Sequence, residues 1–242
     1  MESQDPRNRV VQRGFWSNLL TGFAQCLKWL VVSLLFSIIV EWIGMTFWWE
    51  AQGIDHSQQM LANELSFLGT DVQHSLLTDN PTTYADSLSK WFHVLLFEYT
   101  RILELIEWLS PEPAPGEKGI RLVLRNLYWP MSEYVAAAVQ ITQVFAVRLA
   151  ILTLASPAFG LFALVALVDG LVRRDLRRWG GGRESSFVYH YAKKAAFPLI
   201  ISAWVIYLAL PVSIHPSWVI LPFSIGFAFT VSVTASTFKK YL

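Results

Sequence analysis

Three ionisable residues lie within or at the edges of long apolar runs: Glu41, Arg148 and Asp169. A charge at membrane depth is costly, so such a residue usually pairs with an opposite charge or serves an ion or proton pathway. Glu41 and Arg148 would form an ion pair if their runs pack side by side. Long side chains near a membrane interface can instead reach the headgroup layer without a partner. The sequence leaves open structural pairing, interfacial placement, an ion or proton relay, and contact with a partner protein.

Basic and aromatic side chains are concentrated between residues 171 and 194, which hold seven bases and only two acids. Bases beside apolar runs mark the cytoplasmic side of a membrane, and they also bind anionic lipid headgroups or nucleic-acid phosphates. Several aromatic rings lie among these bases, and membrane orientation alone does not require them. We therefore interpret the stretch as a docking surface or an interfacial anchor. Its candidate docking residues are Arg173, Arg174, Arg177, Arg178, Trp179 and Arg183.

The residue patterns of catalytic, metal and nucleotide sites do not occur in this chain. Cys26 is the only cysteine, and the histidines form no HExxH motif. Three glycines at 180–182 lack the GKS or GKT ending of a phosphate-binding P-loop and follow no predicted strand. We therefore expect no enzymatic activity, no catalytic residue, no cofactor and no metal site.

Four apolar runs are long enough to position these residues in a bilayer. Of the 242 residues, 54% are hydrophobic and 15% are charged, whereas soluble domains average about 25% charged residues. About 20 apolar residues cross a hydrocarbon core of about 30 Å. The first run is too long for the core of a signal peptide and ends in bulky residues, so we interpret it as an uncleaved anchor. The predicted fold class is all-α, a polytopic membrane protein with four transmembrane helices.

The basic residues also orient these spans. The amino-terminal tail, the stretch after the second run and the carboxyl end are basic, whereas residues 50–147 hold twelve acids and only five bases. Since Lys and Arg favour the cytoplasmic side, we expect both termini in the cytoplasm. The predicted segments are a cytoplasmic tail (1–28), a first span (29–49), an external region (50–148), a second span (149–172), a basic cytoplasmic loop (173–194), a third span (195–214), a fourth span (217–236) and a cytoplasmic tail (237–242).

The region between the first two spans is predicted to be helical. Leu61, Leu65 and Leu68 recur at the helical spacing of three and four residues. A second helix is expected over 81–110, before a proline-rich break, and a third is expected to begin near Gly119 and continue into the second span. These amphipathic helices need partners, which the sequence leaves open: each other, the membrane surface or another protein.

The run DGLVRRDLRRWGGGRESSFVYHYAKKAAFPL, from Asp169 to Leu199, resembles the signature of a family of integrating-conjugative-element membrane proteins. That family also occurs on conjugative plasmids and carries a domain of unknown function. The remaining layout is similar to that family as well: a basic tail, one span, an acidic helical region and three spans. The resemblance implies a bacterial inner-membrane protein encoded among type IV secretion genes, near the coupling ATPase that brings DNA to the channel.

From this resemblance we expect a non-enzymatic accessory subunit that binds the coupling ATPase or the channel base through its basic stretch. The external helices would meet channel components or a second copy of the chain, membrane lipids are further partners, and direct DNA contact stays open. Two other functions stay open. One is a small transporter or channel that works through Glu41, Arg148 and prolines in the spans. The other is an envelope protein for entry exclusion or mating-pair stability that works through the external helices.

Overall fold

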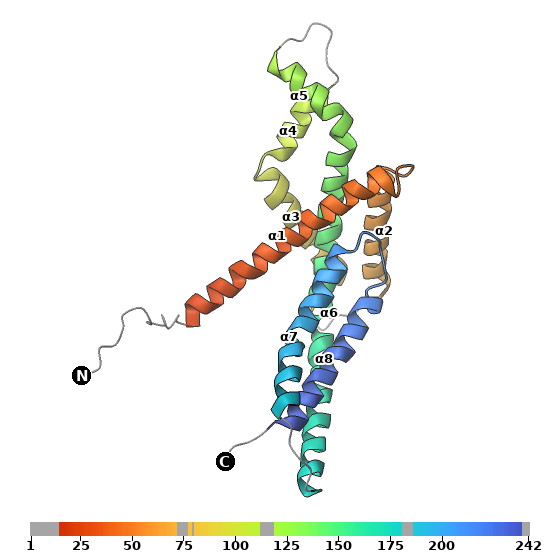
Figure 1. The fold of residues 1–242 in the computed structure, drawn as a ribbon. Helices are drawn as coiled ribbons and strands as arrows, with labels where there is room; N and C mark the ends of the chain where they lie inside the picture. Colours follow the sequence, from red (N-terminus) through yellow and green to blue (C-terminus); the bar gives the residue numbers. More distant parts are fainter. Residues whose placement is uncertain (1–14, 72–76, 79, 112–118, 181–185, 239–242) are drawn as a thin grey trace, which may run out of the picture.

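The computed structural model describes residues 15–71, 77–78, 80–111, 119–180 and 186–238, and these residues form an elongated assembly of helices (Figure 1). Helices account for 88% of the described residues, and no strand occurs among them. This confirms the predicted all-α fold. Four helical segments are long and apolar enough to cross a membrane, which fits a membrane protein: Leu20–Phe47, Leu122–Trp179, Phe187–Ala209 and Ser217–Thr237.

Helix α6 (Ser132–Trp179) is the central element, against which most of the other long helices pack. Its 48 residues rise by about 72 Å at 1.5 Å per residue, which is more than twice the thickness of a bilayer core. Helices α7 (Ser186–Ala209) and α8 (Ser217–Thr237) form an antiparallel hairpin along its carboxyl-terminal half (Figure 1). Residues 210–216 join the two helices of the hairpin. We refer to them as the α7–α8 connector.

Gly170 lets α6 and α8 approach closely. A Cβ atom at this position would lie 2.5 Å from the carbonyl oxygen of Ser232 and 2.7 Å from the Cβ of Ala235. Small residues allow helix backbones to come together in membranes, where dispersion contacts rather than hydrophobic burial drive helix association. The backbones of α6 and α8 therefore come close together at Gly170, where no larger side chain would fit.

Three more helices pack against α6: α1 (Phe15–Phe47), α2 (Ile54–Asp71) and α3 (Pro81–His93). Helix α1 also contacts α7. The buried core lies where these helices meet α7 and α8, and it includes Leu68 of α2, Phe145 of α6 and Leu208 of α7. In Figure 1, α1 runs obliquely to the bundle, whereas α2 lies beside α6.

The chain between α3 and α6 forms an arm that extends away from the α7–α8 hairpin (Figure 1). Its elements are a π-helical turn (Val94–Glu98), α4 (Ile102–Leu109), α5 (Ile120–Tyr128) and a 3-10 turn (Trp129–Met131). The single helix predicted over 81–110 is interrupted at Arg101, whose φ of 56° lies in the left-handed region. A right-handed helix cannot continue through that backbone conformation. The position of this arm outside the membrane stays a prediction.

The described residues of the connection predicted over 173–194 are helical apart from Gly180. Helix α6 continues through Trp179 and α7 begins at Ser186. No proline or glycine interrupts α6 between Gly170 and Gly180. The carboxylate of Asp169 also pairs with Arg173 one turn later, a spacing that supports a helix. Arg173, Arg174, Arg177 and Arg178 therefore project from one continuous helix.

Candidate functional site

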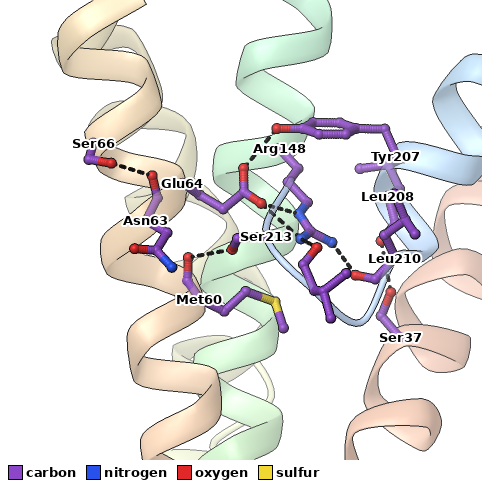
Figure 2. Close-up of polar contacts among 11 residues, drawn as sticks. Ser37, Met60, Asn63, Glu64, Ser66, Arg148, Tyr207, Leu208, Leu210 and Ser213 are labelled. Atoms are coloured by element: carbon purple, nitrogen blue, oxygen red, sulfur yellow. Dashed lines mark hydrogen bonds and ion pairs between the residues drawn. The ribbon is translucent and has the colours of Figure 1, made fainter. Parts of the chain in front are cut away.

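Three residues from three helices form a buried polar cluster (Figure 2): Glu64 of α2, Arg148 of α6 and Tyr207 of α7. Their relative exposures are 0%, 2% and 0%, so the charges are withdrawn from solvent and lipid. The Nε and Nη2 atoms of Arg148 each lie 2.8 Å from Oε1 of Glu64, and the Tyr207 hydroxyl donates to Oε2 at 2.7 Å. The three residues thus satisfy one another, as a buried ion pair requires.

Arg148 also holds the connector that follows α7. Its Nη1 donates to the carbonyl of Leu210 at 2.5 Å, and its Nη2 donates to the carbonyl of Val212 at 2.9 Å. Carbonyls at and beyond a helix end lack helical partners and need donors from elsewhere. The guanidinium carbon also lies 5.5 Å from the centre of the Tyr207 ring, within cation–π range. One side chain therefore links α2, α6 and the α7–α8 connector.

Two further hydrogen bonds hold the same region in place. The Ser213 hydroxyl in the connector donates to the Met60 carbonyl of α2 at 3.1 Å. The Ser37 hydroxyl of α1 donates to the Leu208 carbonyl at the end of α7 at 2.9 Å. Both contacts appear beside the charge cluster in Figure 2. The end of α7 and its connector are thus attached to α1, α2 and α6.

Glu41 and Arg148 do not pair with each other, so the ion pair considered from the sequence is wrong. The side chain of Glu41 is 1% exposed, and its two oxygens lie 3.0 and 3.2 Å from Nδ1 of His56. The His56 ring stacks on Trp49 with ring centres 4.1 Å apart. Helix α2 supplies a partner to each charge, the half-buried His56 and the buried Glu64, whereas the depth of both charges in a membrane stays a prediction.

A small cavity nevertheless separates Glu41 from Arg148. Both residues line it, together with Ser37 and Met60, and its volume is about 10 Å³. A volume of about 10–15 Å³ holds roughly one water molecule. The space is too small for a larger solute, so the two charges have the geometry of structural pairs.

Asp169, the third predicted membrane charge, lies at the surface. Its carboxylate accepts a hydrogen bond from the Ser232 hydroxyl at 2.8 Å and lies 2.9 Å from Nε of Arg173. The Asp169 and Arg173 side chains are 46% and 66% exposed, so their ion pair adds little stability. Asp169 therefore joins α6 to α8 without being a buried charge.

The predicted docking surface lies at the carboxyl end of α6, which we call the basic end. Its described members are Arg173, Arg174, Arg177, Arg178 and Trp179, while Arg183 lies outside the described residues. Trp179 is 93% exposed, and Arg177 donates to the carbonyl of Ser236 on α8. Positive charges are favourable at a helix carboxyl terminus because they oppose the helix dipole. The basic end thus combines Arg177, which is held against α8, with the exposed side chains of Arg178 and Trp179.

Sequence reasoning counted Glu64 among the external acids and did not identify it as the partner of Arg148. The helical stripe was predicted through Leu65, which is 46% exposed. The buried face of α2 instead includes Met60, Glu64 and Leu68. Because these three positions share a spacing of four, an acid on that apolar stripe was the available indication of a buried charge partner.

Replacing Tyr207 with phenylalanine is expected to lower the free energy of unfolding by about 1.5 kcal/mol, the low end for a hydrogen bond to a charged group. Arg148 still neutralises Glu64 in this variant, so the loss is limited to the Tyr207 hydroxyl bond. Denaturant unfolding in detergent micelles measures the difference. Tyr99→Phe is the matched control, because Tyr99 is 85% exposed and should leave the midpoint unchanged. Equal midpoints for both variants would contradict the prediction.

Comparison with known proteins yields a family match that covers most of the chain. A family model described as "IncC plasmid conjugative DNA transfer protein DtrJ-like" matches residues 48–239. No curated protein and no solved structure matches the chain. The matched range contains the buried cluster, the basic end and the Asp169–Leu199 run that carries the resemblance noted from the sequence. Glu41 lies before this range, whereas its partner His56 lies within it.

Proposed function

This chain belongs to the DtrJ-like family of conjugative DNA transfer proteins, and from that membership we propose that it is a non-enzymatic accessory subunit of a type IV secretion system in the bacterial inner membrane. The observation that carries the proposal is the basic end of α6, which combines several arginines with the exposed Trp179. Four helices of span length support an integral membrane subunit.

The proposed topology follows from the length of α6 and the position of its bases. If α6 crosses the bilayer once, the arm lies on one side and the basic end lies on the other. Because Lys and Arg favour the cytoplasm, the basic end and both chain termini are cytoplasmic in this proposal. The arm then lies in the periplasm.

We propose that the basic end docks an acidic surface of the coupling ATPase or of the channel base. Complementary charge steers such partners together and fixes their orientation. An exposed tryptophan adds the kind of apolar anchor that is enriched at binding hot spots. Trp179 and Arg178 are both exposed at this end and can meet a partner directly. Direct contact with DNA phosphates is the alternative use of the same arginines, and salt-dependent binding of naked DNA by the purified chain would favour it.

Changing Arg173, Arg174, Arg177 and Arg178 together to glutamine is expected to lower the conjugation frequency by about 30-fold, if each charge contributes about 0.5 kcal/mol to docking. A mating assay in cells that carry the whole mobile element measures this loss. The four arginine-to-lysine changes are the control, because they preserve both charge and membrane orientation. Reporter fusions at both termini establish the topology of each variant. A glutamine variant with wild-type transfer, level and topology would contradict the docking role.

The arm provides a candidate for a second binding surface on the same subunit. It exposes large apolar side chains, including Tyr99 at 85%, Ile120 at 79% and Leu127 at 61%. Exposed apolar side chains that gather in one region can mark a protein interaction site. We propose that this surface contacts periplasmic channel components or a second copy of the chain, and it would serve entry exclusion or mating-pair stability equally well. Loss of exclusion, with transfer retained, in arm variants would favour that alternative.

The transporter alternative receives less support from the site. Glu41 and Arg148 are held by their own partners, and the cavity between them has the volume of about one water molecule. A Glu41→Gln variant with normal conjugation but lost solute or proton uptake would favour transport.

A further inference from the structure

An apolar groove of about 540 Å³ runs between α6 and α8. Large side chains from both helices form its walls, and several are well exposed: Leu161 is 56%, Val165 is 69% and Phe229 is 67% exposed. No other described helix covers these walls. The groove is therefore open to whatever surrounds the helices.

The polar groups of the groove are found toward one end. Asp169, Arg173, Ser232 and Ser236 line it there. The groove-lining positions Val165, Asp169 and Arg173 follow one another at intervals of four along α6, so position 177 continues the same row. Arg177 reaches α8 from that row by donating to the Ser236 carbonyl. The groove is thus apolar along most of its length, and its polar end adjoins the basic end of α6.

The length of the groove matches half of a bilayer. From Leu161 to Arg173 the helix advances by twelve residues, or about 18 Å. One leaflet of a hydrocarbon core of about 30 Å is about 15 Å deep. A transmembrane helix of a partner would need a complementary face across both leaflets. A chain of leaflet length with a charged end fits this groove better.

We propose that the groove binds an anionic phospholipid of the cytoplasmic leaflet, with an acyl chain along Val165 and Phe229 and the phosphate at Arg173 and Arg177. Basic pockets between membrane helices on the cytoplasmic side hold anionic headgroups, and the guanidinium fork matches the geometry of phosphate oxygens. Arg173 uses only Nε toward Asp169, which leaves its terminal nitrogens for the phosphate.

The Nε atom of Arg177 is buried and has no hydrogen-bond partner among the described residues. Buried polar groups are rarely left unsatisfied, so the Arg177 side chain, which contacts α8 beside the groove, has capacity for a further acceptor. The inference rests on the part of the proposed function that places α6 and α8 in the bilayer. It does not depend on a coupling ATPase.

Thermal unfolding of the purified full-length chain in mixed micelles tests this site. Added phosphatidylglycerol is expected to raise the melting temperature in a saturable manner, whereas phosphatidylcholine with the same acyl chains and inorganic phosphate are not. The double change Arg173→Gln and Arg177→Gln is expected to weaken the apparent affinity for phosphatidylglycerol by about tenfold or more, the equivalent of a lost charge-assisted contact.

Two further variants test the acyl-chain contact and the effect of removing a positive charge elsewhere on the protein. Val165→Trp fills the exposed groove without changing charge and should weaken phosphatidylglycerol binding. Arg101→Gln is the matched control, because Arg101 is also an exposed base beside an acid, Glu104, and it does not line the groove, so this variant should bind like the wild type.

Three results would overturn the lipid site. They are equal stabilisation by phosphatidylcholine, equal stabilisation by inorganic phosphate, and wild-type affinity in the double arginine variant. Cross-linking between two copies through Val165→Cys would assign the groove to a second chain instead. A failed lipid response together with a transfer defect in the four-arginine variant would leave the docking role intact, so the two proposals fail separately. Reporter fusions that place the basic end outside the cytoplasm would contradict the membrane placement that both share.

Discussion

Replacing Arg148 with leucine is expected to lower the free energy of unfolding by about 3–5 kcal/mol, the usual cost of removing one partner from a buried ion pair. The reason is the burial of Glu64, whose relative exposure is 0%. Without the guanidinium, its carboxylate retains only the hydrogen bond from Tyr207. The carbonyls of Leu210 and Val212 lose their donor as well, so the α7–α8 connector loosens from α6. Denaturant titration in detergent micelles, followed by tryptophan fluorescence, measures the loss.

A double substitution tests whether the unpaired Glu64 carboxylate causes this loss of stability. Glu64→Leu together with Arg148→Leu is expected to recover most of the stability, because replacing a whole buried ion pair by apolar side chains is often neutral. Arg101→Gln is the exposed counterpart: the Arg101 and Glu104 side chains are 79% and 70% exposed, so its effect should stay below about 1 kcal/mol. If the double variant is as unstable as the single one, lost packing rather than the unpaired carboxylate dominates.

Replacing Gly170 with valine is expected to lower the free energy of unfolding by about 3 kcal/mol, the upper part of the usual range for overpacking. The new Cβ would lie 2.5 Å from a backbone carbonyl oxygen of α8, which cannot rotate away as a side chain can. Helices α6 and α8 would have to separate to make room. The higher helix propensity of valine offsets only about 0.5 kcal/mol of this cost.

Gly160→Val provides the matched comparison in the same helix. A Cβ atom at Gly160 would meet nothing within 4 Å, so only the propensity gain of about 0.5 kcal/mol applies. Protease resistance and unfolding midpoints of the two variants in micelles report the difference. Opposite signs are expected, with Gly170→Val destabilising and Gly160→Val neutral or slightly stabilising. Equal midpoints would mean that the α6–α8 contact adjusts without cost.

Features that depend on local sequence were predicted well. Long apolar runs and three-to-four spacing predicted an all-helical chain with four span-length helices, because both properties act over neighbouring residues. The run from Asp169 to Leu199 pointed to a conjugation-associated family, and the family match agrees. The loop predicted over 173–194 specified only a connection between two spans, and the structure adds that residues 173–179 within it continue helix α6. Helix breakers begin only at Gly180.

The sequence by itself determined the helices, their apolar character and the position of the bases along the chain. Only the tertiary structure decided which charges meet. Glu64 and Arg148 are 84 residues apart, and Tyr207 and Glu64 are 143 apart, so no local pattern links them. Their contact, like the close approach at Gly170, depends on how α2, α6, α7 and α8 pack. A helical period specifies which side chains share a face, but the neighbour of that face is set by packing among distant segments.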